Sequence, residues 1–163
     1  MPKELETRIR NWLKESAYLN IEIQQNPKAH FSLKISFKNE PVLIPISLSY
    51  PKQFENILIV GWRWKLTDLD AKTFKAIKDS NLKKDLINKI KFKLSALRFD
   101  IEIEPNEYEF ESISVWKYLS VEKLSKENLP KYIIVLEAAY STLMSEFESH
   151  NMSRTTFDAS EYI

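Results

Sequence analysis

The spacing of apolar residues changes several times along this chain, and these changes limit the folds that it can adopt. Over residues 4–17 the apolar side chains are three or four positions apart, which is the period of a helix with one buried face. From residue 19 onward the period is two, so successive side chains point to opposite faces of an extended strand. The chain therefore combines amphipathic helices with half-buried strands, and its 163 residues are enough for one core.

Six segments have the two-residue period of a strand. They are residues 19–24, 31–38, 42–50, 57–65, 99–104 and 111–120. In the third segment Pro45 donates no hydrogen bond to a neighbouring strand, which predicts an edge position or a bulge. In the last segment the apolar register shifts between Val115 and Trp116, which predicts a bulge there.

Three regions have the spacing of helices. They are residues 4–17, residues 67–98 with a break near Ser80 and Asn81, and residues 129–147. The last region repeats its apolar residues as a coiled coil does, but over about three heptads we favour a helix that lies on a sheet. The predicted order is α-β-β-β-β-α-β-β-α, in a single domain over residues 1–148. Residues 149–163 show neither period and are expected to form a C-terminal tail.

Cysteine is absent and Gly61 is the only glycine, so several kinds of site are excluded. The phosphate cradles of P-loops and dinucleotide-binding folds need several glycines. A chain without cysteine has no disulfide, thiolate metal site or cysteine nucleophile, and it fits a reducing, cytoplasmic location. The two histidines have no spacing that suits zinc. We expect no catalytic residue, no metal and no cofactor.

The stretch "LIVGWRWKL" holds two of the four tryptophans, in the fourth strand segment. Trp62 and Trp64 share one face with aliphatic residues, whereas Arg63 points to the other face. The two indoles could stack on nucleic-acid bases, but large aromatic side chains favour burial, so we interpret them as core or as the lining of a pocket. An isolated strand glycine such as Gly61 indicates a bulge or a close approach of another backbone.

Charge is balanced over the whole chain, with a net of +1, but it is not balanced locally. Residues 72–98 carry nine basic side chains against two aspartates, and residues 100–111 are acidic. The acidic side chains alternate with apolar ones, which is typical of a solvated strand face. The basic segment could bind nucleic acid. The candidate contacts are Lys84, Lys89, Lys91 and Lys93. We favour a solvated helix surface, because the lysines are spread around the helix.

Five stretches carry a family resemblance. They are "RIRNWLKESAY", "NPKAHFSLKISF", "LKKDLINKIKFKLSALRFDIEIEP", "ESISVWKYLS" and "LPKYIIVLEAAYSTLM". Over roughly residues 4–148 the chain resembles an uncharacterised archaeal family with a type III secretion chaperone-like (YbjN-like) fold. The resemblance implies an α+β fold in which a curved antiparallel sheet of about six strands packs against helices. Relatives of this fold are commonly homodimers that bind extended segments of other proteins and catalyse nothing.

We therefore expect a protein-binding or chaperone-like module that is not an enzyme, forms a homodimer and holds a protein segment along a sheet edge or an apolar groove. Phe92 lies far from the apolar stripe of its helix, so it is packed by another element or exposed to a partner. The candidate partner contacts are Trp62, Trp64, Phe92 and Trp116. Nucleic-acid binding through residues 72–98 is the alternative function. No membrane partner is expected, and the Ile, Lys and Glu content is typical of a thermophile.

Overall fold

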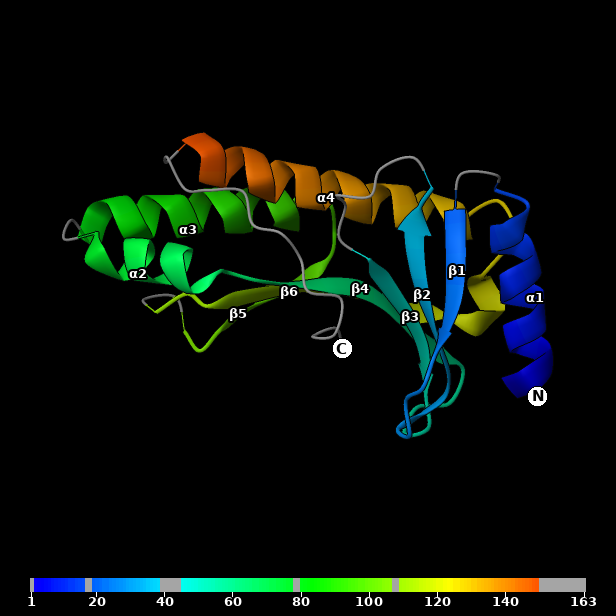
Figure 1. Ribbon diagram of the computed structural model, residues 1–163. Helices are drawn as coiled ribbons and strands as arrows, with labels where there is room; N and C mark the ends of the chain where they lie inside the picture. The colour runs from blue at the N-terminus through cyan, green and yellow to red at the C-terminus, as the bar shows by residue number, and fades with distance from the viewer. Residues whose placement is uncertain (1, 17–18, 39–44, 78–79, 107–108, 150–163) are drawn as a thin grey trace.

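The computed structural model describes residues 2–16, 19–38, 45–77, 80–106 and 109–149. Figure 1 shows a sheet with helices packed on one side. The elements in chain order are α1 (Pro2–Lys14), β1 (Leu19–Gln24), β2 (Ala29–Phe37), β3 (Ile46–Pro51), β4 (Ile57–Lys65), α2 (Asp68–Ala76), α3 (Ser80–Ser95), β5 (Asp100–Glu104), β6 (Ser112–Ser120), the 3-10 turn η1 (Val121–Lys123) and α4 (Leu129–Ser149). The predicted α+β class and element order are confirmed, with the second helical region divided into α2 and α3.

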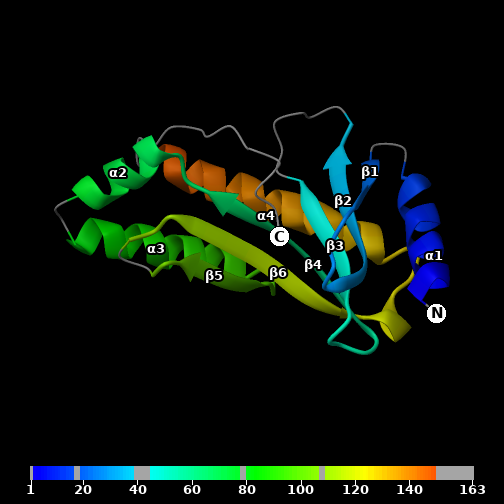
Figure 2. The same ribbon diagram turned by 60° about the horizontal axis from the view of Figure 1, so that its bottom comes forward.

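The strands of the described part form one antiparallel sheet in the order β1-β2-β3-β4-β6-β5. The first four strands pair in chain order. The last two are inverted, so β6 pairs with β4 and β5 forms an edge. The sheet is curved, because β1, β2 and β3 run steeply across the direction of β5 and β6 (Figures 1 and 2).

The core lies between one face of the sheet and the helices. Helix α1 packs against β1 and β2, whereas α4 contacts β4 and lies beside α3. Alternate side chains of each strand enter this core, so the two-residue period of the sequence sets the faces of the sheet. In β4 the core side chains are those of Leu58, Val60, Trp62 and Trp64. We call the other side of the sheet the open face, and Figure 2 views the sheet from that side, with α4 behind it.

The prediction that Pro45 marks an edge strand or a bulge is wrong. Strand β3 begins at Ile46, directly after Pro45, and lies between β2 and β4. The proline therefore precedes the paired residues, so its missing N–H group removes no hydrogen bond from the sheet. Residues 42–44 of the predicted strand lie outside the described residues. The irregularity in this part of the sheet is in β2, where the pairing with β3 shifts between Ala29 and Phe31.

The bulge predicted in β6 is also wrong, because β6 pairs with β4 in one unbroken register from Ser112 to Ser120. The apolar pattern shifts because both faces of β6 carry large side chains. Val115 is buried in the core, and Trp116 is half-buried on the open face. Gly61 lies opposite Trp116 in this ladder. A Cβ atom on Gly61 would lie 2.3 Å from the Val115 carbonyl oxygen and 2.7 Å from the Trp116 Cβ, so the predicted close approach at the glycine is confirmed.

The helix boundaries differ slightly from those predicted. Helix α1 begins at Pro2 and ends at Lys14, and α4 continues to Ser149, one residue into the expected tail. The rest of that tail, residues 150–163, lies outside the described residues. Within the part of the chain that the structure describes, no helix is both long and apolar enough to cross a membrane.

Candidate functional site

Two of the four candidate partner contacts, Trp62 and Trp64, lie inside the core. Each is 1% exposed. The Trp62 Nε1–H donates a hydrogen bond of 2.8 Å to the carbonyl oxygen of Leu136 in α4. The Trp64 ring packs edge-on against Phe147, with the ring centres 4.8 Å apart. The interpretation of these indoles as core is confirmed, and because they have no surface to offer, their selection as partner contacts is corrected.

Trp116, the third candidate, lies opposite Gly61 in the ladder, but its side chain is on the open face, across the sheet from the other two. On the same face Tyr118 is 50% exposed and packs edge-on against Phe54 at 6.1 Å between ring centres. Arg63 also points to this side, as predicted, and donates a hydrogen bond of 2.7 Å to the Glu104 carboxylate. Strand alternation thus separates the aromatic residues of β4 from those of β6.

Phe92, the fourth candidate, lies on the outer surface of α3 and is 77% exposed. The core side of α3 is formed by Leu86, Ile87, Ile90 and Leu94. Leu82 is 50% exposed, because it lies in the first turn and to one side of these residues. Phe92 lies almost opposite the buried stripe, so no neighbouring element of the described part covers it.

The candidate nucleic-acid contacts on α3 do not form one cluster. Lys84, Lys89 and Lys91 are exposed; Lys84 and Lys91 share one side of the helix, two turns apart, whereas Lys89 lies on another side. Lys93 instead forms an ion pair with Glu146 of α4, whose side chain is 9% exposed. One of the four lysines therefore joins two helices.

The acidic segment lies next to α3. Asp100, Glu102 and Glu104 occupy alternate positions of the edge strand β5, on the open face, and Glu104 accepts the hydrogen bond from Arg63. No three histidine, aspartate or glutamate residues of the described ranges are placed to hold a metal ion.

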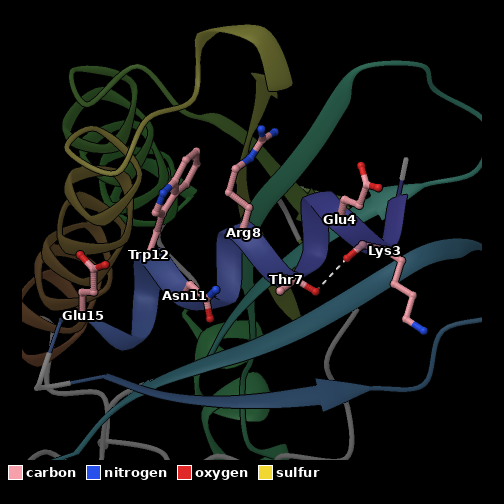
Figure 3. Close-up of a pocket in the computed structure, with 7 residues that line it drawn as sticks. All are labelled: Lys3, Glu4, Thr7, Arg8, Asn11, Trp12 and Glu15. Carbon is pink, nitrogen blue, oxygen red and sulfur yellow. Dashed lines mark hydrogen bonds between the residues drawn. The ribbon is translucent and has the colours of Figure 1, made fainter.

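A surface depression lies on α1, at residues that the sequence did not mark as a candidate site. It has a volume of about 620 Å³, and Figure 3 shows its lining residues projecting from α1 and from the turn that follows it. They are Lys3, Glu4, Thr7, Arg8, Asn11, Trp12 and Glu15. The Arg8 guanidinium lies 5.4 Å from the centre of the Trp12 ring, a cation–π contact. The spacing of four residues between Arg8 and Trp12 was the available signal, because such residues are neighbours on a helix.

One charged pair borders this depression. The Lys126 amine lies 2.7 Å from the Glu15 carboxylate. The hydrogen bond to Glu15 and the charge of that carboxylate raise the pKa of Lys126 above its ordinary value of 10.5. The pair connects α1 to the segment between η1 and α4.

Residues 5–147 match the profile of an uncharacterized conserved protein family, DUF2299. The chain belongs to the DUF2299 family. No curated protein is significantly similar in sequence to this DUF2299 chain.

Two solved structures share the fold of this DUF2299 chain. An uncharacterized protein from Methanothermobacter thermautotrophicus superposes with a TM-score of 0.77 at 18% identity, covering 90% of this chain and 98% of that one. YbjN from E. coli, a candidate transcription regulator, superposes with a TM-score of 0.50 at 13% identity, covering 93% of this chain and 96% of that one. The expected YbjN-like fold is confirmed, and the expected similarity to archaeal proteins is supported by the Methanothermobacter structure.

Proposed function

We propose that this DUF2299 chain is a chaperone-like, protein-binding module that works as a homodimer and catalyses no reaction. The observation that carries the proposal is the position of Phe92, 77% exposed on the outer surface of α3. Burial of an aromatic ring against a partner contributes to the free energy of binding, and aromatic residues are enriched in protein interfaces, so this exposed ring supports a binding role. The YbjN-like fold supports the same function.

Peptide selection tests the binding function. Peptides selected from a random library against the purified protein are expected to bind the wild-type chain and to bind Phe92→Ser about tenfold or more weakly. Ile134→Ser is the matched control, because Ile134 is also an exposed apolar residue on a helix but lies on α4. Failure to enrich any peptide, or equal binding by the wild-type and Phe92→Ser proteins, would contradict the proposal.

Light scattering tests the homodimer. We expect a mass of twice the 19.3 kDa chain at micromolar concentration. The aromatic residues of the open face, the half-buried Trp116 and the exposed Tyr118, support self-association, because aromatic residues are enriched in protein interfaces. A mass of one chain throughout the concentration range would rule the dimer out.

We also infer a cytoplasmic location and a thermophilic host. The cysteine-free sequence fits a reducing compartment, and the Lys and Glu content fits proteins that work at high temperature. The expected melting temperature lies above the range of about 45–65 °C of mesophilic domains. A melting temperature within that range would argue against the thermophilic host.

Nucleic-acid binding through residues 72–98 is the second candidate function. Lys84 and Lys89 support it, since both are exposed and neither forms an ion pair within the described ranges. Binding through phosphate contacts weakens steeply with salt. An anisotropy titration that detects no oligonucleotide binding at about 50 mM salt would remove this candidate.

A further inference from the structure

We infer that the outer surface of α3 binds an acidic protein segment that presents an apolar side chain between its carboxylates. This inference rests on the proposed protein-binding function and specifies its partner. The binding surface consists of Lys84, Asp85, Asn88, Lys89 and Phe92. We call these five residues the α3 ridge.

The geometry of the helix places Phe92 between positive charges. Successive residues of an α-helix are rotated by about 100°, so Phe92 points about 200° away from the buried Ile90. Lys89 lies one turn before Phe92 and about 60° to one side, and Lys84 lies about two turns before it and about 80° to the other side. A segment lying along the ridge therefore meets an aromatic ring with a lysine on either side.

The two lysines are available to a partner. Neither Lys84 nor Lys89 has an ion pair with the described residues. Lys93, by contrast, is held by Glu146. Asp85 is the acidic side chain of the ridge, so the ridge keeps a positive excess that complements a segment with carboxylates.

The neighbouring charges favour a short peptide over a nucleic acid. A polyanion needs a basic track along several phosphates. Asp85 lies almost in line with Phe92 on the ridge, and Asp100 and Glu102 of β5 are exposed next to α3. These carboxylates repel the regularly repeated charges of a phosphate backbone and the carboxylates of a peptide alike. A peptide, however, can carry uncharged residues opposite them and place its few acidic residues against Lys84 and Lys89.

The contributions of the two kinds of contact differ. Exposed ion pairs contribute little, so the loss of each lysine is expected to weaken binding by about fivefold at most. Burial of the Phe92 ring contributes more, and its loss is expected to weaken binding by about 30-fold.

The test uses a labelled synthetic peptide of about 15 residues that forms a helix with Leu and Phe on one face and Glu on both flanks. A second peptide has Gln in place of every Glu, and an oligothymidylate serves as a polyanion without apolar side chains. Anisotropy is measured at low and high salt against the wild-type chain, Phe92→Ser, and the double variant Lys84→Glu with Lys89→Glu. Lys131→Glu on the exposed side of α4 is the matched charge control, and circular dichroism verifies the fold of each variant.

We expect the acidic peptide to bind about tenfold or more tightly than its Gln counterpart at low salt, and to lose affinity in Phe92→Ser and in the double variant but not in Lys131→Glu. Equal binding of the two peptides, no binding of the acidic peptide, or tighter binding of the oligothymidylate would overturn the inference. If peptides from the library selection bind through Phe92 but without dependence on charge, the proposed function stands and only the acidic partner is wrong. If neither the selected nor the synthetic peptides bind, both fail.

Discussion

Gly61 shows how one residue constrains the sheet at the residue scale. We expect Gly61→Ala to lower the free energy of unfolding by about 3 kcal/mol, because the added Cβ overpacks a tight contact. The Val115 carbonyl oxygen and the Trp116 Cβ would lie 2.3 and 2.7 Å from the new atom, and neither belongs to a flexible side-chain end. Urea denaturation, followed by circular dichroism, measures the change.

The control for this substitution is Ser47→Ala, opposite Gly61 on β3. The Ser47 hydroxyl is buried and has no hydrogen-bond partner within the described part of the chain. Its removal is expected to leave stability unchanged or to raise it by up to about 1 kcal/mol. If the Gly61→Ala protein were as stable as the Ser47→Ala protein, β4 and β6 would be able to move apart around the added Cβ without a loss of stability, and the prediction would be wrong.

Trp62 combines an apolar ring with a single buried polar group. We expect Trp62→Phe to destabilise the protein by about 2 kcal/mol, because it removes the hydrogen bond to the Leu136 carbonyl and leaves unfilled volume. Trp116→Phe, at a half-buried position, is expected to cost less than about 1 kcal/mol. Equal effects of the two substitutions on the urea midpoint would contradict the assignment of Trp62 to the core.

At the scale of elements, Lys93 and Glu146 connect α3 to α4. Lys93→Met is expected to cost about 1–3 kcal/mol, since it leaves a nearly buried carboxylate without this partner. Adding Glu146→Leu to Lys93→Met should recover most of that loss, which a double-mutant cycle measures. Lys84→Met, on the same helix but without an ion pair to any described residue, should change stability by no more than about 0.5 kcal/mol. A Lys93→Met protein with the stability of Lys84→Met would argue against the pairing.

The pair of Glu15 and Lys126 connects α1 to the segment before α4, and it gives a pH-dependent signal. Because the pKa of Lys126 is raised in the folded protein, the pair stabilises the fold below the ordinary lysine pKa of 10.5, and this contribution is lost as the pH rises through the higher folded value. Glu15→Gln is expected to lower the pKa of Lys126 toward 10.5, as an NMR titration of the lysine side chain would detect. High salt should reduce the shift, because the pair is exposed. A pKa that does not change in Glu15→Gln would contradict the pairing.

At the scale of the whole molecule, the buried residues form one connected core. It includes residues of α1 and α4, and residues that lie in or next to each of the six described strands. We therefore expect residues 1–148 to unfold as one cooperative unit. Urea transitions followed by far-ultraviolet circular dichroism and by tryptophan fluorescence should coincide, since Trp62 and Trp64 lie where α4 meets the sheet. Two separate midpoints would instead indicate two domains.

The type and order of the elements follow from the sequence. The bounds of β4, the burial of Trp62 and Trp64, the opposite orientation of Arg63 and the position of Phe92 away from the buried stripe of α3 all follow from periods of two or 3.6 residues. These periods arise from local backbone geometry, so a short stretch of sequence carries them in full.

Which elements are neighbours depends on the tertiary structure. The inverted order of β5 and β6, the central position of β3 after Pro45 and the contact of Gly61 with Trp116 depend on strands that are far apart in the sequence. The apolar shift in β6 could not be interpreted from its own residues, because it depends on what covers each face of the sheet. The hydrophobic period indicates that one face of an element is buried, but it does not indicate which element covers that face. The covering element depends on long-range pairing.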